Sequence, residues 1–127
     1  MGNFEPAKTN AEAATTVGAS SCAFDATNQF RITQGGFRFD HATQRFVQTV
    51  TLQQLTLTPV ALPLSLVLDN LSPNATLFNQ TGFTTCAVPA GSPFINVQGN
   101  TVTLEFANPT MSGISYSVRV LEGPANR

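Results

Sequence analysis

The chain has 127 residues and a net charge of −1, and charged residues make up only 10% of it, against a typical share of about 25%. One lysine and five scattered arginines do not form the basic surface that nucleic acids and anionic membranes require, so we expect neither as a partner. No apolar run approaches the roughly 20 residues of a membrane-spanning helix, and we expect no membrane insertion.

Residues 1–21 differ in composition from the rest of the chain. They are rich in Ala, Thr, Ser, Asn and Gly, and they show neither the basic start nor the apolar run of a signal peptide. We therefore expect a flexible N-terminal arm or linker over 1–21 and one β-sandwich domain over 22–127. If the protein is secreted, we expect this chain to be a mature or excised part of it.

After the arm, apolar residues recur at every second position, which is the period of a β-strand with one buried face. Phe30 and Ile32 alternate with polar residues, and so do Phe37 and Phe39. The glycines at 35–36 stand between these two runs and predict a β-bulge or a sharp bend.

The run 45–53 has one exception to its pattern. It places Phe46, Val50 and Leu52 on one face, and Val47, Thr49 and Thr51 on the other. Gln48 falls on the apolar face, where a polar side chain needs a hydrogen-bond partner; without one, the assumed register of this strand is wrong.

Further strand-like runs follow at 62–71, 74–79, 83–88, 92–97, 101–107 and 114–121. Pro63 is expected to confine the start of its strand to a sheet edge. The residues of these runs that we expect to face inward are Leu62, Leu64, Leu66, Leu68, Val102, Leu104, Phe106, Ile114, Tyr116, Val118 and Val120.

Turn-forming sequences such as "NLSPN", "PAGSP" and "NPTMSG" separate these runs. Seven or eight short strands separated by turns, with no helical period, predict an all-β fold. We expect an antiparallel β-sandwich, with a barrel as the alternative.

The chain has two cysteines, Cys22 and Cys86, which we expect to form a disulfide in a secreted protein. The alternative is a pair of buried thiols in a cytosolic protein. The uncharged surface, rich in Thr and Asn, favours an extracellular or cell-surface location. Neither cysteine lies in a CxxC pattern and the chain has one histidine, so we expect no zinc site.

That histidine, His41, follows Asp40 between two predicted strands. We expect a hairpin turn in which the Asp40 side chain caps the backbone, rather than a member of a Ser–His–Asp triad. The chain also lacks a GxSxG nucleophile motif.

The acidic residues point to no catalytic pair. They are Glu5, Glu12, Asp25, Asp40, Asp69, Glu105 and Glu122. We expect solvated surface charges, with a weak calcium site at Asp69 and Asn70 as the alternative. The sequence therefore predicts no catalytic residue, no metal ligand and no cofactor. Three Asn-x-Ser/Thr triplets, beginning at Asn70, Asn74 and Asn79, are expected by chance in a chain of this composition.

Five segments carry a resemblance to a known type of module: "GFRFDHATQRFVQTVTL", "PLSLVLDNLSPNATLFNQTG", "GSPFINV", "VTLEFANP" and "ISYSVRVLEGP". From Phe30 onward the sequence resembles the Ig-like or fibronectin-III-like β-sandwich module found at the C-terminal ends of secreted bacterial proteins. The resemblance implies an accessory, extracellular, non-catalytic domain, and it carries over no ligand and no site residue.

These observations lead to one main hypothesis and two alternatives. The main hypothesis is a non-catalytic module of a bacterial surface or secreted protein with a spacer, adhesion or protein-interaction role. One alternative is a self-assembling subunit of an extracellular fibre, in which edge strands or the arm 1–21 add to a neighbouring sheet. The other is a carbohydrate-binding module, although the chain has no Trp, its one Tyr faces inward, and only Phe78, Phe83 and Phe94 are unplaced among its aromatic residues.

Overall fold

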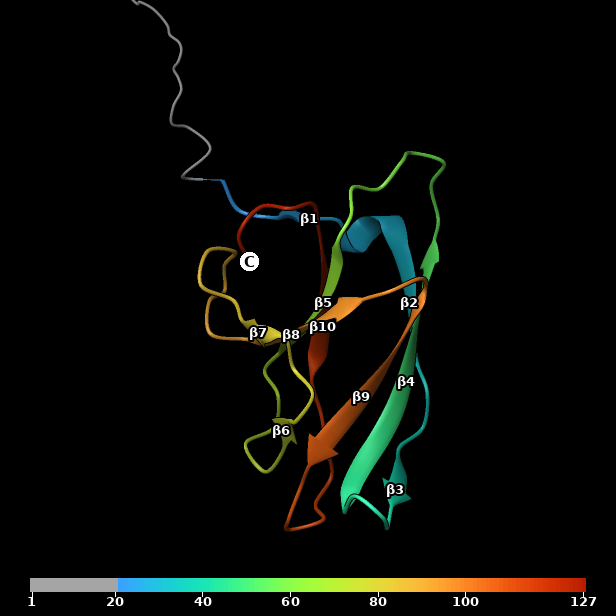
Figure 1. Cartoon of the computed structure of the whole chain (residues 1–127), viewed down its shortest axis with the longest axis vertical. Coiled ribbons are helices and arrows are strands. Elements are labelled where there is room, and N and C mark those ends of the chain that lie inside the picture. Colours follow the sequence, from blue (N-terminus) through green and yellow to red (C-terminus); the bar gives the residue numbers. More distant parts are fainter. Residues whose placement is uncertain (1–20) are drawn as a thin grey trace, which may run out of the picture.

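The computed structural model describes residues 21–127, which form a sandwich of two antiparallel β-sheets (Figure 1). Apart from Ser21, the predicted arm lies outside these residues. The strands are β1 (Phe24–Asp25), β2 (Phe30–Gln34), β3 (Arg38–Asp40), β4 (Arg45–Gln54), β5 (Leu64–Asp69), β6 (Thr76–Leu77), β7 (Gly82–Phe83), β8 (Pro93–Val97), β9 (Thr101–Ala107) and β10 (Ser117–Glu122). A single 3₁₀ turn, Thr27–Gln29, joins β1 to β2.

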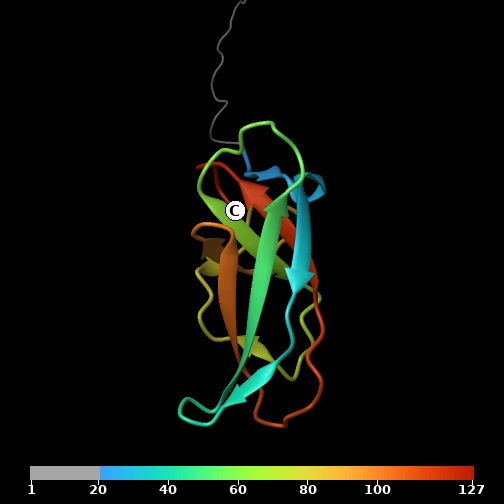
Figure 2. The same ribbon diagram turned by 90° about the vertical axis from the view of Figure 1, so that its right-hand side faces the viewer.

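The first sheet has the strand order β1-β10-β5-β8-β7, and the second has the order β2-β4-β9-β6, with β3 also paired to β4. In Figure 2, β2, β4 and β9 run side by side in front, while β5 and β10 cross behind them. The predicted all-β sandwich is confirmed. The structure has ten strands rather than seven or eight, because four pieces of only two or three residues are separate strands. The Ig-like assignment stays a prediction.

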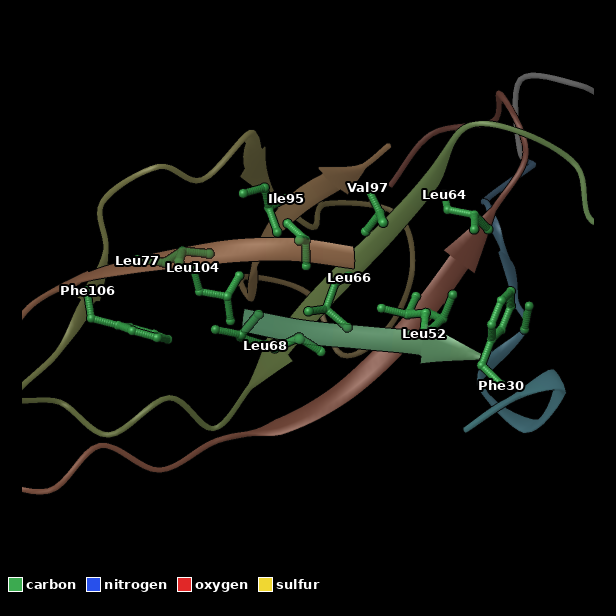
Figure 3. Packing of buried hydrophobic residues seen from close by; sticks show 14 of the residues in the cluster. Phe30, Leu52, Leu64, Leu66, Leu68, Leu77, Ile95, Val97, Leu104 and Phe106 are labelled. Atoms are coloured by element: carbon green, nitrogen blue, oxygen red, sulfur yellow. The ribbon is translucent and has the colours of Figure 1, made fainter. Parts of the chain in front are cut away.

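The core lies between the two sheets and is built from the alternating residues of the longer strands (Figure 3). Val50 and Leu52 of β4, and Leu104 and Phe106 of β9, are at most 2% exposed. Each large apolar side chain buried in this way stabilises the fold by about 1.5–3 kcal/mol. The alternation in the sequence therefore identifies the inner face of the second sheet correctly.

Strand β5 is buried along its whole length and on both faces. Leu64, Leu66 and Leu68 face the core, while a smaller cluster of Ala23, Val67, Ala87 and Leu121 covers the opposite face of the sheet. A strand covered on both faces is expected to have a nearly continuous apolar sequence, as "LSLVLD" does.

Two predictions for this segment are wrong. Leu62 does not face the core; its side chain is 72% exposed, because the strand begins two residues later. Pro63 does not mark a sheet edge, since β5 lies between β10 and β8, and the proline precedes the strand.

Three further residues differ in detail from the prediction. Ile114 and Tyr116 precede β10 and pack against the core from a loop. Val47, on the outer face of the second sheet, is buried because its cross-strand neighbours are Arg38 and Glu105, whose long side chains cover apolar surface.

The two glycines form the predicted bulge. Gln34 of β2 lies opposite Val50, and Arg38 of β3 lies opposite Val47, so three residues face two on β4. The extra residue shifts the alternation by one position, which keeps Phe37 on the face that the apolar residues of β2 occupy.

Replacing Gly35 by Ala is expected to lower the free energy of unfolding by about 1–3 kcal/mol, because a Cβ there would lie 2.9 Å from the Thr49 carbonyl oxygen. Gly36→Ala is the matched control, since a Cβ at that position meets nothing within 4 Å, and it is expected to stay within about 1 kcal/mol of the wild type. Urea denaturation of both variants measures the difference. Equal stabilities would show that the bulge is looser than described.

Candidate functional site

The histidine lies at the tip of the β3–β4 hairpin and is exposed. The Asp40 carboxylate accepts a hydrogen bond from the Ala42 backbone N–H at 3.0 Å, and the Gln44 side-chain amide donates to the His41 carbonyl at 2.9 Å. The rings of Phe39 and His41 meet edge to face, with centroids 4.9 Å apart. The predicted hairpin turn is confirmed, and Asp40 shapes that turn as expected.

Gln48 has the hydrogen-bond partners that its position demands. Its side chain is 3% exposed; the amide nitrogen donates to the Gly35 carbonyl at 2.7 Å, and the Tyr116 hydroxyl donates to the amide oxygen. The register of β4 is therefore as predicted. The glutamine ties the bulge of the second sheet to the segment that precedes β10.

The burial of the Tyr116 hydroxyl can be measured through its ultraviolet absorbance, because Tyr116 is the only tyrosine and the chain has no tryptophan. Burial raises the pKa of its hydroxyl to about 12. We expect the phenolate absorbance of the folded protein to titrate near that value, and that of the denatured protein near pH 10. Since the pKa is raised, the associated stability is complete below about pH 10 and is lost as the pH rises through the folded value. Tyr116→Phe serves as the blank for this titration. A titration midpoint near pH 10 in the folded protein would contradict the burial of the hydroxyl.

Asp69, predicted to be a solvated charge or a weak calcium ligand, is buried in an ion pair. The Arg119 guanidinium donates two hydrogen bonds to the carboxylate, from Nε to one oxygen at 2.6 Å and from Nη2 to the other at 2.9 Å. The Ser92 hydroxyl donates a third at 2.6 Å. Arg119 also donates to the carbonyls of Val88 and Pro89. The pair therefore joins β5 and β10 to the loop that covers them, and both carboxylate oxygens are engaged.

The surroundings of Asp69 have opposing effects on its ionisation. Burial by itself raises the pKa of the Asp69 carboxyl, but hydrogen bonds from Arg119 and Ser92, together with the charge of Arg119, outweigh burial and leave the pKa below its ordinary value. The carboxylate form is thus stabilised by the fold.

The other described acids also have structural roles. Asp25 accepts the Thr27 backbone N–H at 3.0 Å, and Glu122 accepts the Ala61 N–H at 2.7 Å. Glu105 pairs with Arg45 at 3.4 Å, and the guanidinium of Arg45 lies 3.3 Å from the centroid of the Phe78 ring. Glu5 and Glu12 lie outside the described residues. In the part of the chain that the structure describes, no three His, Cys, Asp or Glu residues are grouped as metal ligands would be.

The structure joins Cys22 and Cys86 in a disulfide, as predicted, with their Cα atoms 5.5 Å apart although the residues are 64 positions apart in the sequence. The bond ties the segment before β1 to the loop between β7 and β8. Around this bond lies the small outer cluster that covers Val67 and Leu121.

Two of the Asn-x-Ser/Thr asparagines use their side chains inside the protein. Asn74 donates to the Asn108 side-chain oxygen at 3.1 Å and to the Gly113 carbonyl at 3.0 Å. Asn79 donates to the Thr103 carbonyl at 2.9 Å. A glycan at either position would displace these bonds, which agrees with the prediction that these two triplets are incidental.

One open apolar surface lies at the end of the sandwich that carries the β3–β4 hairpin, which is the lower end in Figure 1. Two hollows of about 430 and 240 Å³ meet at Met111. Their lining residues, which we call the hairpin-end surface, are Phe37, Phe39, Gln44, Phe46, Ala107, Asn108, Pro109, Met111, Ser112, Gly113 and Ile114. Met111 is 61% exposed and Phe37 is 42% exposed.

The loop that presents Met111 is held by the buried Asn108. The Asn108 side chain donates to the Ser112 carbonyl at 2.6 Å, and its carbonyl accepts the Met111 N–H at 3.0 Å. Met111 has a backbone φ of 55°, which is uncommon for a residue with a side chain. The turn sequence "NPTMSG" predicted a loop here, but nothing in it indicated that the methionine would be displayed.

The opposite end of the sandwich has a third hollow of about 430 Å³, lined in part by Phe30, Val60 and Leu62. Leu55 and Leu57, in the loop between β4 and β5, are exposed beside it. No ionisable side chain lines this hollow or the other two.

The three unplaced phenylalanines are found on different surfaces. Phe94 is partly buried in the outer cluster of the first sheet. Phe83 and Phe78 are more than half exposed, and Phe78 lies against Arg45. The structure therefore does not bring these rings together as one platform.

Comparisons with protein-family models, with curated proteins and with solved structures give no match to this chain. Among residues 21–127 there is no helix with the length and apolar character needed to cross a membrane. The functional argument therefore starts from the surfaces described above.

Proposed function

We propose that this chain is a non-catalytic, extracellular recognition module of a bacterial surface or secreted protein, which binds an uncharged apolar segment of a partner protein at the hairpin-end surface. The observation that supports it best is the lining of the three hollows, which contains no ionisable side chain. Acid–base and nucleophilic catalysis need such groups within hydrogen-bond reach of the reacting atoms. The disulfide supports an extracellular location, since such bonds persist in oxidising surroundings.

The hairpin-end surface has the chemistry of a protein-binding site. Methionine adapts its shape to varied apolar partners, and exposed aromatic rings supply contact area with little loss of side-chain freedom. The amides of Gln44 and Asn108 line the larger hollow and offer hydrogen bonds without charge. An apolar side chain of the partner would enter the hollow beside Met111.

Selection from a displayed peptide library tests this proposal. The full chain is expected to enrich uncharged peptides that contain Leu, Ile, Phe or Trp, and Met111→Lys is expected to weaken their binding by about tenfold or more. Leu57→Lys, the same change at a more exposed apolar residue of the opposite end, serves as the control and is expected to leave binding unchanged. Failure to enrich apolar peptides, or equal binding by Met111→Lys, would overturn the proposal.

Carbohydrate binding is the second candidate, because Phe37, Phe39 and the Gln44 amide share this end of the protein. A sugar ring would stack on an exposed aromatic face and bond to the amide. Glycan-array binding that is lost in Phe37→Ala, with no peptide enrichment, would favour this candidate over the first.

The edges of the second sheet give less support to the fibre hypothesis. The Asn79 side chain takes the place of a backbone partner on β9, donating to the Thr103 carbonyl and accepting the Glu105 N–H at 3.0 Å. The β2–β3 edge is broken by the bulge and flanked by the exposed Arg31 and Arg38. Capped, interrupted and charged edges disfavour the addition of a strand. Residues 1–20, on which that hypothesis also depends, lie outside the description.

A further inference from the structure

The first and last described segments of the chain lie side by side. Cys22 pairs with Asn126 in a parallel bridge, and the Ala23 N–H donates to the Asn126 carbonyl at 2.7 Å. The chain therefore enters the sandwich at Cys22 and reaches Arg127 at nearly the same place (Figure 1).

Arg127 is fixed there by its main chain. Its carbonyl oxygen accepts the backbone N–H groups of Thr85, Cys86 and Ala87 at 3.1, 3.0 and 2.8 Å. Three successive N–H groups directed at one oxygen form a concave donor site that holds this oxygen firmly. One of these three residues, Cys86, is covalently joined to Cys22.

The Arg127 side chain adds a second anchor. Its guanidinium donates to the Ser65 hydroxyl and to the carbonyls of Pro63 and Ala125, each at 2.8 Å, and also to the carbonyl of Gly123. The bonds to Ser65 and Pro63 attach the residue to the start of β5, the central strand of the first sheet. We call the disulfide together with these contacts of Arg127 the clasp.

The clasp creates a short mechanical path through the module. A pull on Cys22 passes through the disulfide to Cys86, and from its backbone N–H to Arg127. The apolar core between the sheets is not on this path. Because the segments at Cys22 and Asn126 run parallel, pulling their outer ends apart makes them slide past each other and loads the bonds together rather than one by one.

We propose that the module is a tension-bearing link, in which force applied between residues 21 and 127 is carried by the clasp and not by the sandwich core. This inference rests on the proposed function, in that tension along a longer extracellular protein containing this recognition module is applied between residues 21 and 127, not through the partner bound at the hairpin end. The hairpin-end surface is far from the clasp, so the core stays unloaded and the binding surface keeps its shape under tension.

Single-molecule force spectroscopy on the full chain, placed between identical handle domains, tests this inference. Arg127→Gln is expected to lower the rupture force by roughly 40%, since the side chain makes two of the five hydrogen bonds that join Arg127 to other segments of the chain. Tyr116→Phe, a core change away from the clasp, is the control and is expected to leave the rupture force unchanged. The opposite ranking of the two variants would show that the core carries the force.

A second pulling geometry keeps the test decisive if Arg127→Gln does not fold. An attachment point at Asn100, in the turn between β8 and β9, takes the contacts of Arg127 off the path and leaves only the disulfide of the clasp on it. Rupture between the N-terminal handle and Asn100 is expected at a lower force than rupture across the whole chain, and equal forces would overturn the inference. In the oxidised protein the 64-residue interval between the cysteines stays closed, which shortens the released length by about 200 Å relative to Cys22→Ser/Cys86→Ser.

The two proposals fail separately. Met111→Lys is expected to weaken peptide binding by about tenfold or more and to leave the rupture force unchanged. A clasp that does not carry the force would leave peptide binding intact, and a hairpin-end surface that binds nothing would leave the force measurements intact.

Discussion

Removing the disulfide is expected to lower the free energy of unfolding by about 4 kcal/mol, because the bond closes a long loop of 64 residues and restricts the unfolded chain. The loop that carries Cys86 also holds the Arg127 carbonyl, so its release weakens the clasp as well. Urea denaturation of the wild type with and without reductant, and of Cys22→Ser/Cys86→Ser, measures the effect.

The serine variant is the control for the reductant itself and is expected to respond to it hardly at all. Alkylation followed by mass spectrometry checks that the wild type has no reactive thiol before reduction and two afterwards. A wild-type midpoint that does not move although both thiols have become reactive would contradict a stabilising role for this bond.

Replacing Asp69 by Asn is expected to destabilise the protein by about 3 kcal/mol, because it leaves the Arg119 guanidinium buried without its counter-charge. The side chains of Asp69 and Arg119 are only 12% and 11% exposed, so breaking this pair costs more stability than breaking a solvent-exposed salt bridge does. Asp25→Asn, at an exposed position, is the matched control and is expected to cost less than about 1 kcal/mol.

The double variant Asp69→Asn/Arg119→Met shows where the loss comes from. It is expected to be more stable than Asp69→Asn alone, since no unpaired charge remains in the interior. A double variant that loses the sum of the two single effects would show that the two residues act independently.

The same pair predicts how stability depends on pH. Because the fold lowers the pKa of Asp69, its contribution is complete above the unfolded value of about 4 and is lost as the pH falls through the folded value. The stability gap between the wild type and Asp69→Asn should therefore narrow below about pH 4. A gap that stays constant at lower pH would contradict the ion pair.

Local patterns in the sequence predict the inner faces of the sandwich well. The period of two places Val102, Leu104 and Phe106 in the core, and the glycine pair marks the bulge that keeps Phe37 near it. These features depend on residues close together in the chain, because the pleat sets the face and the bulge shifts it. The hairpin turn at His41 is local in the same way.

Features that join distant parts of the chain could not be predicted. Asp69 and Arg119 are 50 positions apart, and only the pairing of β5 with β10 brings them together. The sequence predicted that Gln48 needs a hydrogen-bond partner, but that partner, Tyr116, is 68 positions away and could not be identified. The residues that cover the outer face of β5 come from loops. Loop sequences have no hydrophobic period, so their burial could not be predicted.

The candidate site shows the same limit. Its aromatic residues belong to predicted strands, but the display of Met111 depends on a left-handed backbone conformation and on hydrogen bonds from Asn108. A methionine in that conformation has no sequence signature, since glycine and asparagine are the usual residues there. The two hollows therefore could not be predicted from the sequence, because they form between the loop that carries Met111 and the β3–β4 hairpin.

The most direct test of the recognition role is to map where a selected peptide binds. Nuclear magnetic resonance spectra of the isotopically labelled full chain, titrated with the tightest peptide from the library, report on each backbone amide. We expect the largest shift changes at Phe37, Phe39, Met111 and Ile114, with the amides around Leu57 unchanged. Changes concentrated at the opposite end of the sandwich, or none at saturating peptide, would contradict the account.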